Sequence, residues 1–133
     1  MKIARRVLLI EDDLDDQSLF CESLMELYPS FVCERANDGP QAITMISQNT
    51  FYDFIFIDLN LPKLDGFQVL ERIRDTGRVE QVPLIILSST NRQSDIDRCY
   101  SLGATSFFTK PSSYSELIEV MRAAFQAPLA LNK

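Results

Sequence analysis

Five short apolar segments, separated by stretches of helical periodicity, constrain the fold of this chain most strongly. Residues 7–10 and 54–57 are apolar at every position, and an acidic residue follows each of them. Uninterrupted runs of this length are typical of strands buried on both faces of a parallel sheet. The three other candidate strands are residues 31–35, 84–87 and 107–109.

Between these segments, apolar residues recur at the three- to five-residue spacing of amphipathic helices. Residues that commonly begin or end helices lie at the limits of these helical stretches. They are Pro29, Asp38-Gly39, Asp65-Gly66, Gly103 and Ser112 or Ser113. The most polar helix is expected over about residues 92–102. The alternation predicts an α/β fold in which five helices cover both faces of a five-stranded parallel sheet.

The length of 133 residues fits one domain, expected over residues 1–127 with a short tail over 128–133. Nineteen acidic residues against 13 basic ones give a net charge of −6, which argues against direct nucleic-acid binding. The apolar run after Arg5-Arg6 is too short for a signal peptide or a membrane span. We therefore expect a cytoplasmic protein.

Histidine is absent, which excludes Ser-His-Asp catalysis and the usual zinc ligands. The three cysteines, Cys21, Cys33 and Cys99, are widely spaced and form no C-x-x-C motif. Reduced thiols are therefore the expected state.

Chemically active side chains follow four of the five predicted strands. Glu11 and Asp12 follow the first strand, Asp58 the third, Ser88 the fourth and Lys110 the fifth. The carboxyl ends of parallel strands meet at one edge of the sheet, where ligands of open α/β sheets bind. Clustered carboxylates call for a hard divalent cation such as Mg²⁺, and an aspartate can act as a nucleophile on phosphorus.

Each of these residues also has a simpler structural explanation. Acidic residues are common at helix N-termini, and we expect Asp15 and Asp16 to be the solvated start of a helix. Asp58 alone could be a turn residue, and Ser88 a cap. Their order at consecutive strand ends favours a phosphoryl-transfer site.

The chain resembles the receiver domain of two-component response regulators, including stand-alone chemotaxis-type and phytochrome-associated regulators. The resemblance runs from residue 7 to about 125 and is carried by VLLIEDD (7–13), FIDLNLPKLDGFQVL (56–70), PLIILSST (83–90) and GATSFFTKP (103–111). It implies a flavodoxin-like, doubly wound sheet with strand order 2-1-3-4-5.

The resemblance also implies roles for single residues. Asp58 is the phosphoacceptor, and Mg²⁺, for which Mn²⁺ can substitute, binds Asp12, Glu11, Asp58 and the backbone carbonyl of Asn60. Ser88 and Lys110 contact the phosphoryl group.

Further implied features concern signalling. Ser88 and Phe107 form the switch, although Phe107 could equally be a plain core aromatic residue. The Lys110-Pro111 peptide is expected to be cis. Asn60 and Thr90 lie at positions that tune dephosphorylation.

The implied function is a phosphorelay response regulator. A sensor histidine kinase or a histidine phosphotransfer protein donates the phosphoryl group, and a surface over residues 92–126 signals to a downstream protein. The domain would catalyse only its own phosphorylation and dephosphorylation. The sequence does not determine whether the protein forms a homodimer. It also does not determine whether the protein is a stand-alone regulator or part of a longer protein.

Three other hypotheses account for part of the pattern. A pseudo-receiver would share the fold as an interaction module without phosphorylation, but Asp58, Asp12 and Lys110 argue against it. A flavin or nucleotide binder would require a glycine-rich loop after the first strand, and the chain has only four glycines. A haloacid-dehalogenase-type phosphatase would need a second acid where Asn60 stands.

Overall fold

The computed structural model describes residues 5–48 and 51–131, with side chains described as far as residue 126. The strands are β1 (Arg6–Ile10), β2 (Val32–Ala36), β3 (Phe54–Asp58), β4 (Leu84–Ser88) and β5 (Ser106–Thr109). They pair in parallel in the order β2-β1-β3-β4-β5. The predicted fold class and strand order are confirmed.

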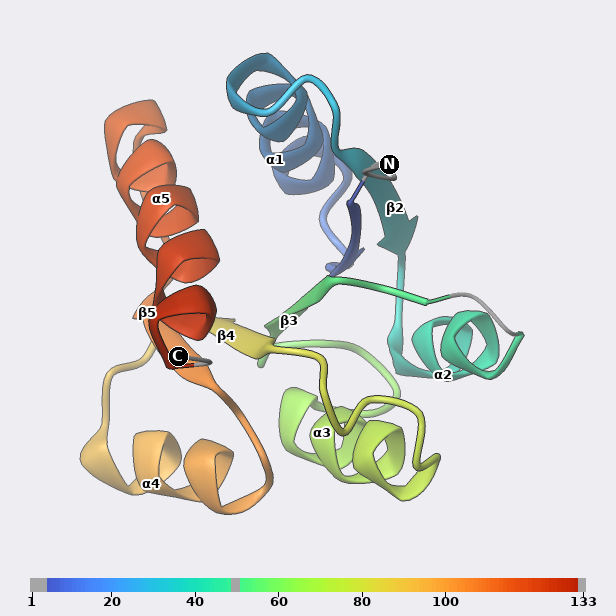
Figure 1. The fold of residues 1–133 in the computed structure, drawn as a ribbon. Coiled ribbons are helices and arrows are strands. Elements are labelled where there is room, and N and C mark those ends of the chain that lie inside the picture. The colour runs from blue at the N-terminus through green and yellow to red at the C-terminus, as the bar shows by residue number, and fades with distance from the viewer. Residues whose placement is uncertain (1–4, 49–50, 132–133) are drawn as a thin grey trace.

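Five helices connect and follow the strands. They are α1 (Leu14–Leu27), α2 (Gly39–Ser47), α3 (Gly66–Asp75), α4 (Gln93–Ser101) and α5 (Tyr114–Leu131). Helices α1 and α5 cover one face of the sheet, and α2, α3 and α4 cover the other (Figure 1). Within the described residues, no helix is long and apolar enough to cross a membrane.

The end of α5 differs from the sequence prediction. Residues 128–131, expected to belong to a tail, continue the helix as far as Leu131. Proline lacks an N–H and disfavours helix interiors, so Pro128 in the sequence favours a helix end at residue 127. The neighbouring alanine and leucine residues are strong helix formers, and the helix passes through the proline.

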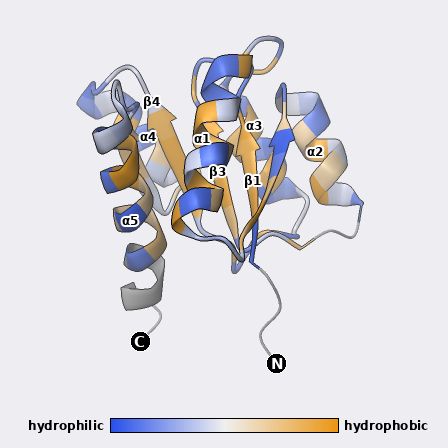
Figure 2. Ribbon diagram, turned by 90° about the horizontal axis from the view of Figure 1, so that it is seen from above, coloured by the Kyte–Doolittle hydropathy of each residue, from blue (hydrophilic) through white to orange (hydrophobic). Residues whose placement is uncertain are grey.

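Alternating side chains of the central strands build one apolar core on each face of the sheet. Leu8, Ile10, Ile55 and Ile57 face α2 and α3 and belong to one cluster. The cluster on the opposite face contains Val7, Leu9, Phe54, Phe56, Phe20, Met121 and Phe125. The apolar strands lie inside a shell of more polar helices (Figure 2). Burial on both faces explains why these strands are continuous apolar runs.

The helices differ in how firmly they are fixed. Asp13, Asp38 and Asp65 each cap a helix by accepting a hydrogen bond from the third helical N–H. Helix α4 has no side-chain cap at Arg92, and Cys99 is its one buried residue. Gly103 follows α4 with a φ of 109°, the left-handed conformation expected for a helix-closing glycine.

The prediction of three reduced cysteines is wrong for two of them. Cys21 on α1 and Cys33 on β2 form a disulfide with a Cα–Cα distance of 5.8 Å, whereas Cys99 is free and buried. Their sequence separation of 12 residues matches no cysteine motif. The packing of α1 beside β2 brings them together, which spacing alone does not reveal.

Candidate functional site

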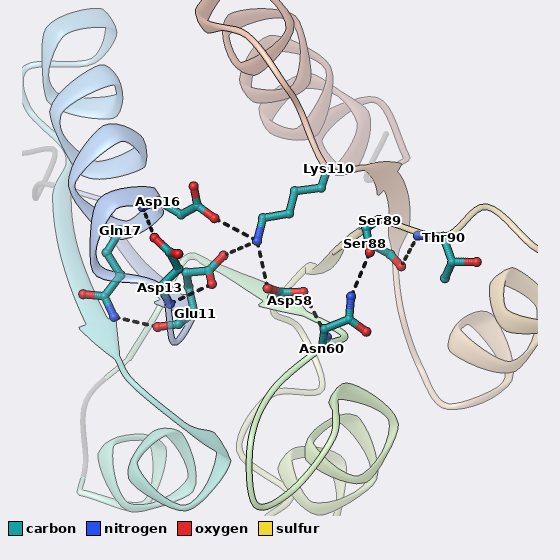
Figure 3. A network of polar contacts seen from close by, with 10 residues as sticks. All are labelled: Glu11, Asp13, Asp16, Gln17, Asp58, Asn60, Ser88, Ser89, Thr90 and Lys110. Atoms are coloured by element: carbon teal, nitrogen blue, oxygen red, sulfur yellow. Dashed lines mark hydrogen bonds and ion pairs between the residues drawn. The ribbon is translucent and has the colours of Figure 1, made fainter.

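The polar residues that follow the strands meet at one edge of the sheet, as predicted. Glu11 follows β1, Asp58 and Ser88 are the last residues of β3 and β4, and Lys110 follows β5. Figure 3 shows these four side chains with their neighbours at the ends of the strands. Parallel pairing places the carboxyl ends of all strands at this edge.

Three carboxylates form a group at this edge. One oxygen from each of Glu11, Asp12 and Asp58 lies within 4.8 Å of the others. Glu11 and Asp58 are both 3% exposed, whereas Asp12 is exposed to solvent. An all-oxygen set of this kind suits a hard divalent cation such as Mg²⁺ and lacks the nitrogen and sulfur ligands that zinc prefers.

The Lys110 side chain crosses this acidic group. Its Nζ atom lies 2.9 Å from Glu11 Oε1, 3.0 Å from Asp16 Oδ2 and 3.0 Å from Asp58 Oδ2. Partial burial on its own lowers the pKa of Lys110, but the hydrogen bonds to the three carboxylates outweigh it and raise the pKa well above its ordinary value. Lys110 is therefore held in its charged form.

Glu11 is the most perturbed acid of the group. Burial raises its pKa from 4.5 to about 7, with a further contribution from the neighbouring charge of Asp58. The backbone N–H of Asp13, at 3.0 Å from Oε2, and the ammonium of Lys110 act in the opposite direction. Burial is thus the main reason that Glu11 holds its proton more strongly than an exposed glutamate does.

Both oxygens of Asp58 have hydrogen-bond donors. Oδ1 accepts from the backbone N–H of Asn60 at 3.0 Å, and Oδ2 accepts from Lys110. The Asn60 side chain donates to the Ser89 hydroxyl at 2.8 Å, which ties the loop after β3 to the loop after β4. Ser88 is fully buried, and its hydroxyl accepts from the backbone N–H of Thr90 at 3.1 Å.

The loop after Asp58 folds back closely onto the strand end. The N–H of Gly66 donates to the carbonyl of Leu59 at 2.9 Å. A Cβ atom at position 66 would lie 2.5 Å from the Leu59 Cα, so only glycine fits. The motif residues Asp65 and Gly66 thus close the loop and begin α3 with a capping box.

Comparison with known proteins identifies the family. The model of the response regulator receiver domain matches residues 7–122. The chain belongs to this family. The resemblance stated from the sequence motifs is confirmed, and the cluster described above lies at the strand ends of a receiver domain.

Individual relatives support the assignment. The receiver domain is 32% identical over 127 residues to the transcriptional regulatory protein HprR of Escherichia coli, covering 96% of this chain and 54% of HprR. It is 25% identical to the two-component response regulator ORR5 of Oryza sativa over 86% of this chain and 84% of ORR5. The chain thus spans about half the length of HprR.

Solved structures agree with the fold. The phosphorylated cyanobacterial phytochrome response regulator RcpA superposes with a TM-score of 0.83 at 26% identity, covering 96% of this chain and 95% of RcpA. The receiver domain of the Pseudomonas aeruginosa kinase PA1611, with a magnesium ion in its active-site cleft, gives 0.79 at 27% identity, covering 94% and 98%.

The prediction of a cis peptide bond between Lys110 and Pro111 is wrong. The described residues contain no cis peptide bond, so the Lys110-Pro111 bond is trans. The trans isomer is the one that X–Pro bonds favour, by about 0.5–1 kcal/mol.

Phe107, the other switch candidate, is partly buried on β5 and packs against the core cluster that faces α2 and α3.

Two site residues were not predicted. Asp15 is exposed as expected, but Asp16, also assigned to a solvated helix start, pairs with Lys110. Helical side chains lean toward the helix N-terminus, which directs Asp16 toward the strand ends and could have indicated the contact. Gln17 is buried at 2% exposure and donates to the Glu11 carbonyl at 2.6 Å. Its three-residue spacing from buried Phe20 was an available signal.

Proposed function

We propose that this receiver domain accepts a phosphoryl group on Asp58 from a phosphohistidine of a sensor kinase or a phosphotransfer protein. The observation that carries the proposal is the position of Asp58, a 3% exposed carboxylate beside two other carboxylates and 3.0 Å from an ammonium. Family membership supports the same function.

The reaction follows from the groups present. A carboxylate oxygen of Asp58 attacks phosphorus in line, the bond between phosphorus and the histidine nitrogen breaks, and the nitrogen leaves with its electron pair. Lys110 offers its charge to the phosphoryl oxygens. The Ser88 hydroxyl, at the end of the strand that pairs with β3, would exchange its bond with the Thr90 N–H for one with the phosphoryl group. Water later cleaves the acyl phosphate and restores Asp58.

Mg²⁺ fits the residues of the site. Asp12, Glu11 and Asp58 would hold it, with the backbone carbonyl of Asn60 as a fourth protein group and Mn²⁺ as a substitute. When bound, the cation supplies positive charge against the charge that develops on the transferring group. The grouping of three carboxylate oxygens within 4.8 Å of one another supports this assignment.

Signalling would follow from a change in residues 92–126, which include α4, β5 and the first part of α5, with Ser88 and Phe107 as the switch. The partners are a phosphoryl donor and a downstream protein, with no direct nucleic-acid contact. Homodimerisation is compatible with this scheme. We place the protein in the cytoplasm and assign residues 1–127 to the receiver unit. We expect it to catalyse only its own phosphorylation and dephosphorylation.

Intact-mass measurement after incubation with acetyl phosphate and Mg²⁺ tests the proposal. The parent protein should gain the mass of one phosphoryl group, and the adduct should disappear on treatment with hydroxylamine. Asp58→Asn, which keeps the size of the side chain, should gain none. Chelation of divalent cations should suppress the reaction.

An unmodified parent protein, tested with both acetyl phosphate and a phosphorylated histidine phosphotransfer protein, would contradict the proposal. The chain would then be a pseudo-receiver, acting by protein contact alone. Equal modification of the parent and Asp58→Asn would place the phosphoryl group on another residue.

A further inference from the structure

Lys110 has a third carboxylate partner that lies outside the candidate metal-binding group. Asp16 Oδ2 is 3.0 Å from Lys110 Nζ, the same separation as Asp58 Oδ2. Asp16 lies in the first turn of α1, whose N-cap is Asp13. Figure 3 shows the ammonium between Asp16 on α1 and Asp58 on β3.

Asp16 differs from the other two partners in its surroundings. Its side chain is 45% exposed, whereas those of Glu11 and Asp58 are each 4% exposed. It is absent from the group of described carboxylates within 4.8 Å of one another. Asp16 therefore contacts Lys110 from outside the candidate metal-binding group.

The position of Asp16 is well defined by the chain around it. Its backbone N–H donates to Asp13 Oδ1 at 2.9 Å, which fixes the first turn of α1. The next residue, Gln17, anchors that turn to Glu11 and, at 2.7 Å, to Asn37 Oδ1. The carboxylate of Asp16 is thus presented to Lys110 from a helix turn bonded to the end of β1.

An ammonium group has three N–H donors, and at Lys110 each can be assigned to one carboxylate. A phosphoryl group on Asp58 needs at least one of these donors. Asp16 competes for it, and its negative charge also repels the incoming anion. Both effects have the same sign, since each weakens the interaction of the site with a phosphoryl group.

We propose that Asp16 is a positioning residue that holds the Lys110 ammonium toward α1 and so limits its contact with the phosphoryl group. The inference rests on the proposed function and deepens it. Asp16 sets how strongly this receiver domain stabilises its phosphorylated state. Removing its charge should strengthen that state, whereas a residue with a merely structural role would weaken it when replaced.

The chain offers a matched control. Asp15 lies beside Asp16 in the same helical turn, is exposed, and has no ion pair with any described residue. Asp15→Asn and Asp16→Asn therefore remove the same charge from the same helix N-terminus. The two variants should lose similar stability through the helix dipole, and only the second releases Lys110.

The test is a titration of the four proteins, the parent, Asp15→Asn, Asp16→Asn and Asp16→Glu, with beryllofluoride in Mg²⁺, followed by ¹⁹F NMR. We expect Asp16→Asn to bind about two- to fivefold more tightly than the parent, the range of a partly exposed ion pair. Asp15→Asn should differ from the parent by less than Asp16→Asn does, and Asp16→Glu should stay near the parent. Thermal unfolding of each variant verifies that it is folded.

Equal or weaker binding by Asp16→Asn than by Asp15→Asn would overturn the inference while leaving the proposed function intact. A parent protein that binds no beryllofluoride would overturn the proposed function and the inference together. The two failures are therefore distinguished by the parent alone.

Discussion

Asp58 combines burial with charge, two properties that conflict unless donors surround the carboxylate. Its two oxygens meet the Asn60 N–H from the following loop and the Lys110 ammonium from beyond β5. Leaving a buried carboxylate without such donors is costly. Donors from separate elements therefore satisfy both oxygens of this buried carboxylate.

Gly66 allows the first stability prediction. Gly66→Ala would place a methyl group 2.5 Å from the Leu59 Cα, and a backbone atom cannot move away as a flexible side chain can. We expect a loss of about 1–3 kcal/mol in the free energy of unfolding, typical of overpacking. Urea unfolding at neutral pH measures it.

Gly77 provides the control for this substitution. It has a φ of 70°, but no atom lies within 4 Å of a Cβ added there. Gly77→Ala therefore carries conformational cost without steric overlap and should destabilise the protein less than Gly66→Ala. Similar losses for both variants would show that crowding at Leu59 is not the cause.

At the residue scale, the sequence predicted the main members of the site but not their full set of contacts. Asp58, Glu11 and Lys110 could be predicted to meet because they follow parallel strands. Asp16 could not be predicted from strand ends, because its contact depends on how the first turn of α1 is oriented. The Ser88 hydroxyl accepts a hydrogen bond from the Thr90 N–H. The sequence does not show which rotamer the serine side chain adopts.

Asp13, Asp38 and Asp65 are the N-caps of α1, α2 and α3. Asp38 is also paired with a lysine. Asp38 accepts from the Gln41 N–H at 2.8 Å and from Lys63 Nζ at 3.0 Å. These bonds hold the pKa of Asp38 below its ordinary value of 3.8. The lowered pKa means that the ionised form stabilises the folded state.

We expect Asp38→Ala to lower the free energy of unfolding by about 1 kcal/mol at neutral pH, as for other N-caps. A depressed folded-state pKa gives stability that is complete above the unfolded value and is lost as pH falls through the folded value. The difference between parent and variant should therefore shrink below pH 3.8. Urea unfolding at a series of pH values measures it.

Asp38→Asn separates the two bonds, because asparagine also caps helices but carries no charge for Lys63. It should keep most of the neutral-pH stability. A loss as large as that of Asp38→Ala would assign the effect to the ion pair instead of the cap.

Element boundaries followed the sequence closely where caps and apolar runs agree. Observed strands differ from the predicted ones by about a residue, since backbone pairing extends into the flanking polar residues. The larger difference is at the end of α5, where the alanine and leucine residues around Pro128 continue the helix as far as Leu131. Strand order came from family resemblance, because periodicity carries no information about which strands are adjacent.

At the scale of the whole molecule, the Cys21–Cys33 disulfide links a helix to the edge strand β2. It closes a loop with a sequence separation of 12 residues. Restricting the unfolded chain over such a loop contributes about 3 kcal/mol in the loop-entropy model. We expect dithiothreitol to lower the urea midpoint of the oxidised protein accordingly.

The double variant Cys21→Ala and Cys33→Ala is the control, since it has no crosslink to reduce. Its urea midpoint should not respond to dithiothreitol. Peptide mapping under non-reducing conditions should recover the linked peptides from the parent. Identical midpoints for the parent with and without reductant would contradict the predicted contribution.

Helix α4 is held in place by few side chains. With one buried side chain and no capping side chain, it contributes little to either core. Its buried residue, Cys99, belongs to the cluster that includes Ile57 and Ile86. The surface next to β5 is thus carried by a helix that few buried side chains hold, whereas the strands that align the acidic residues are packed on both faces.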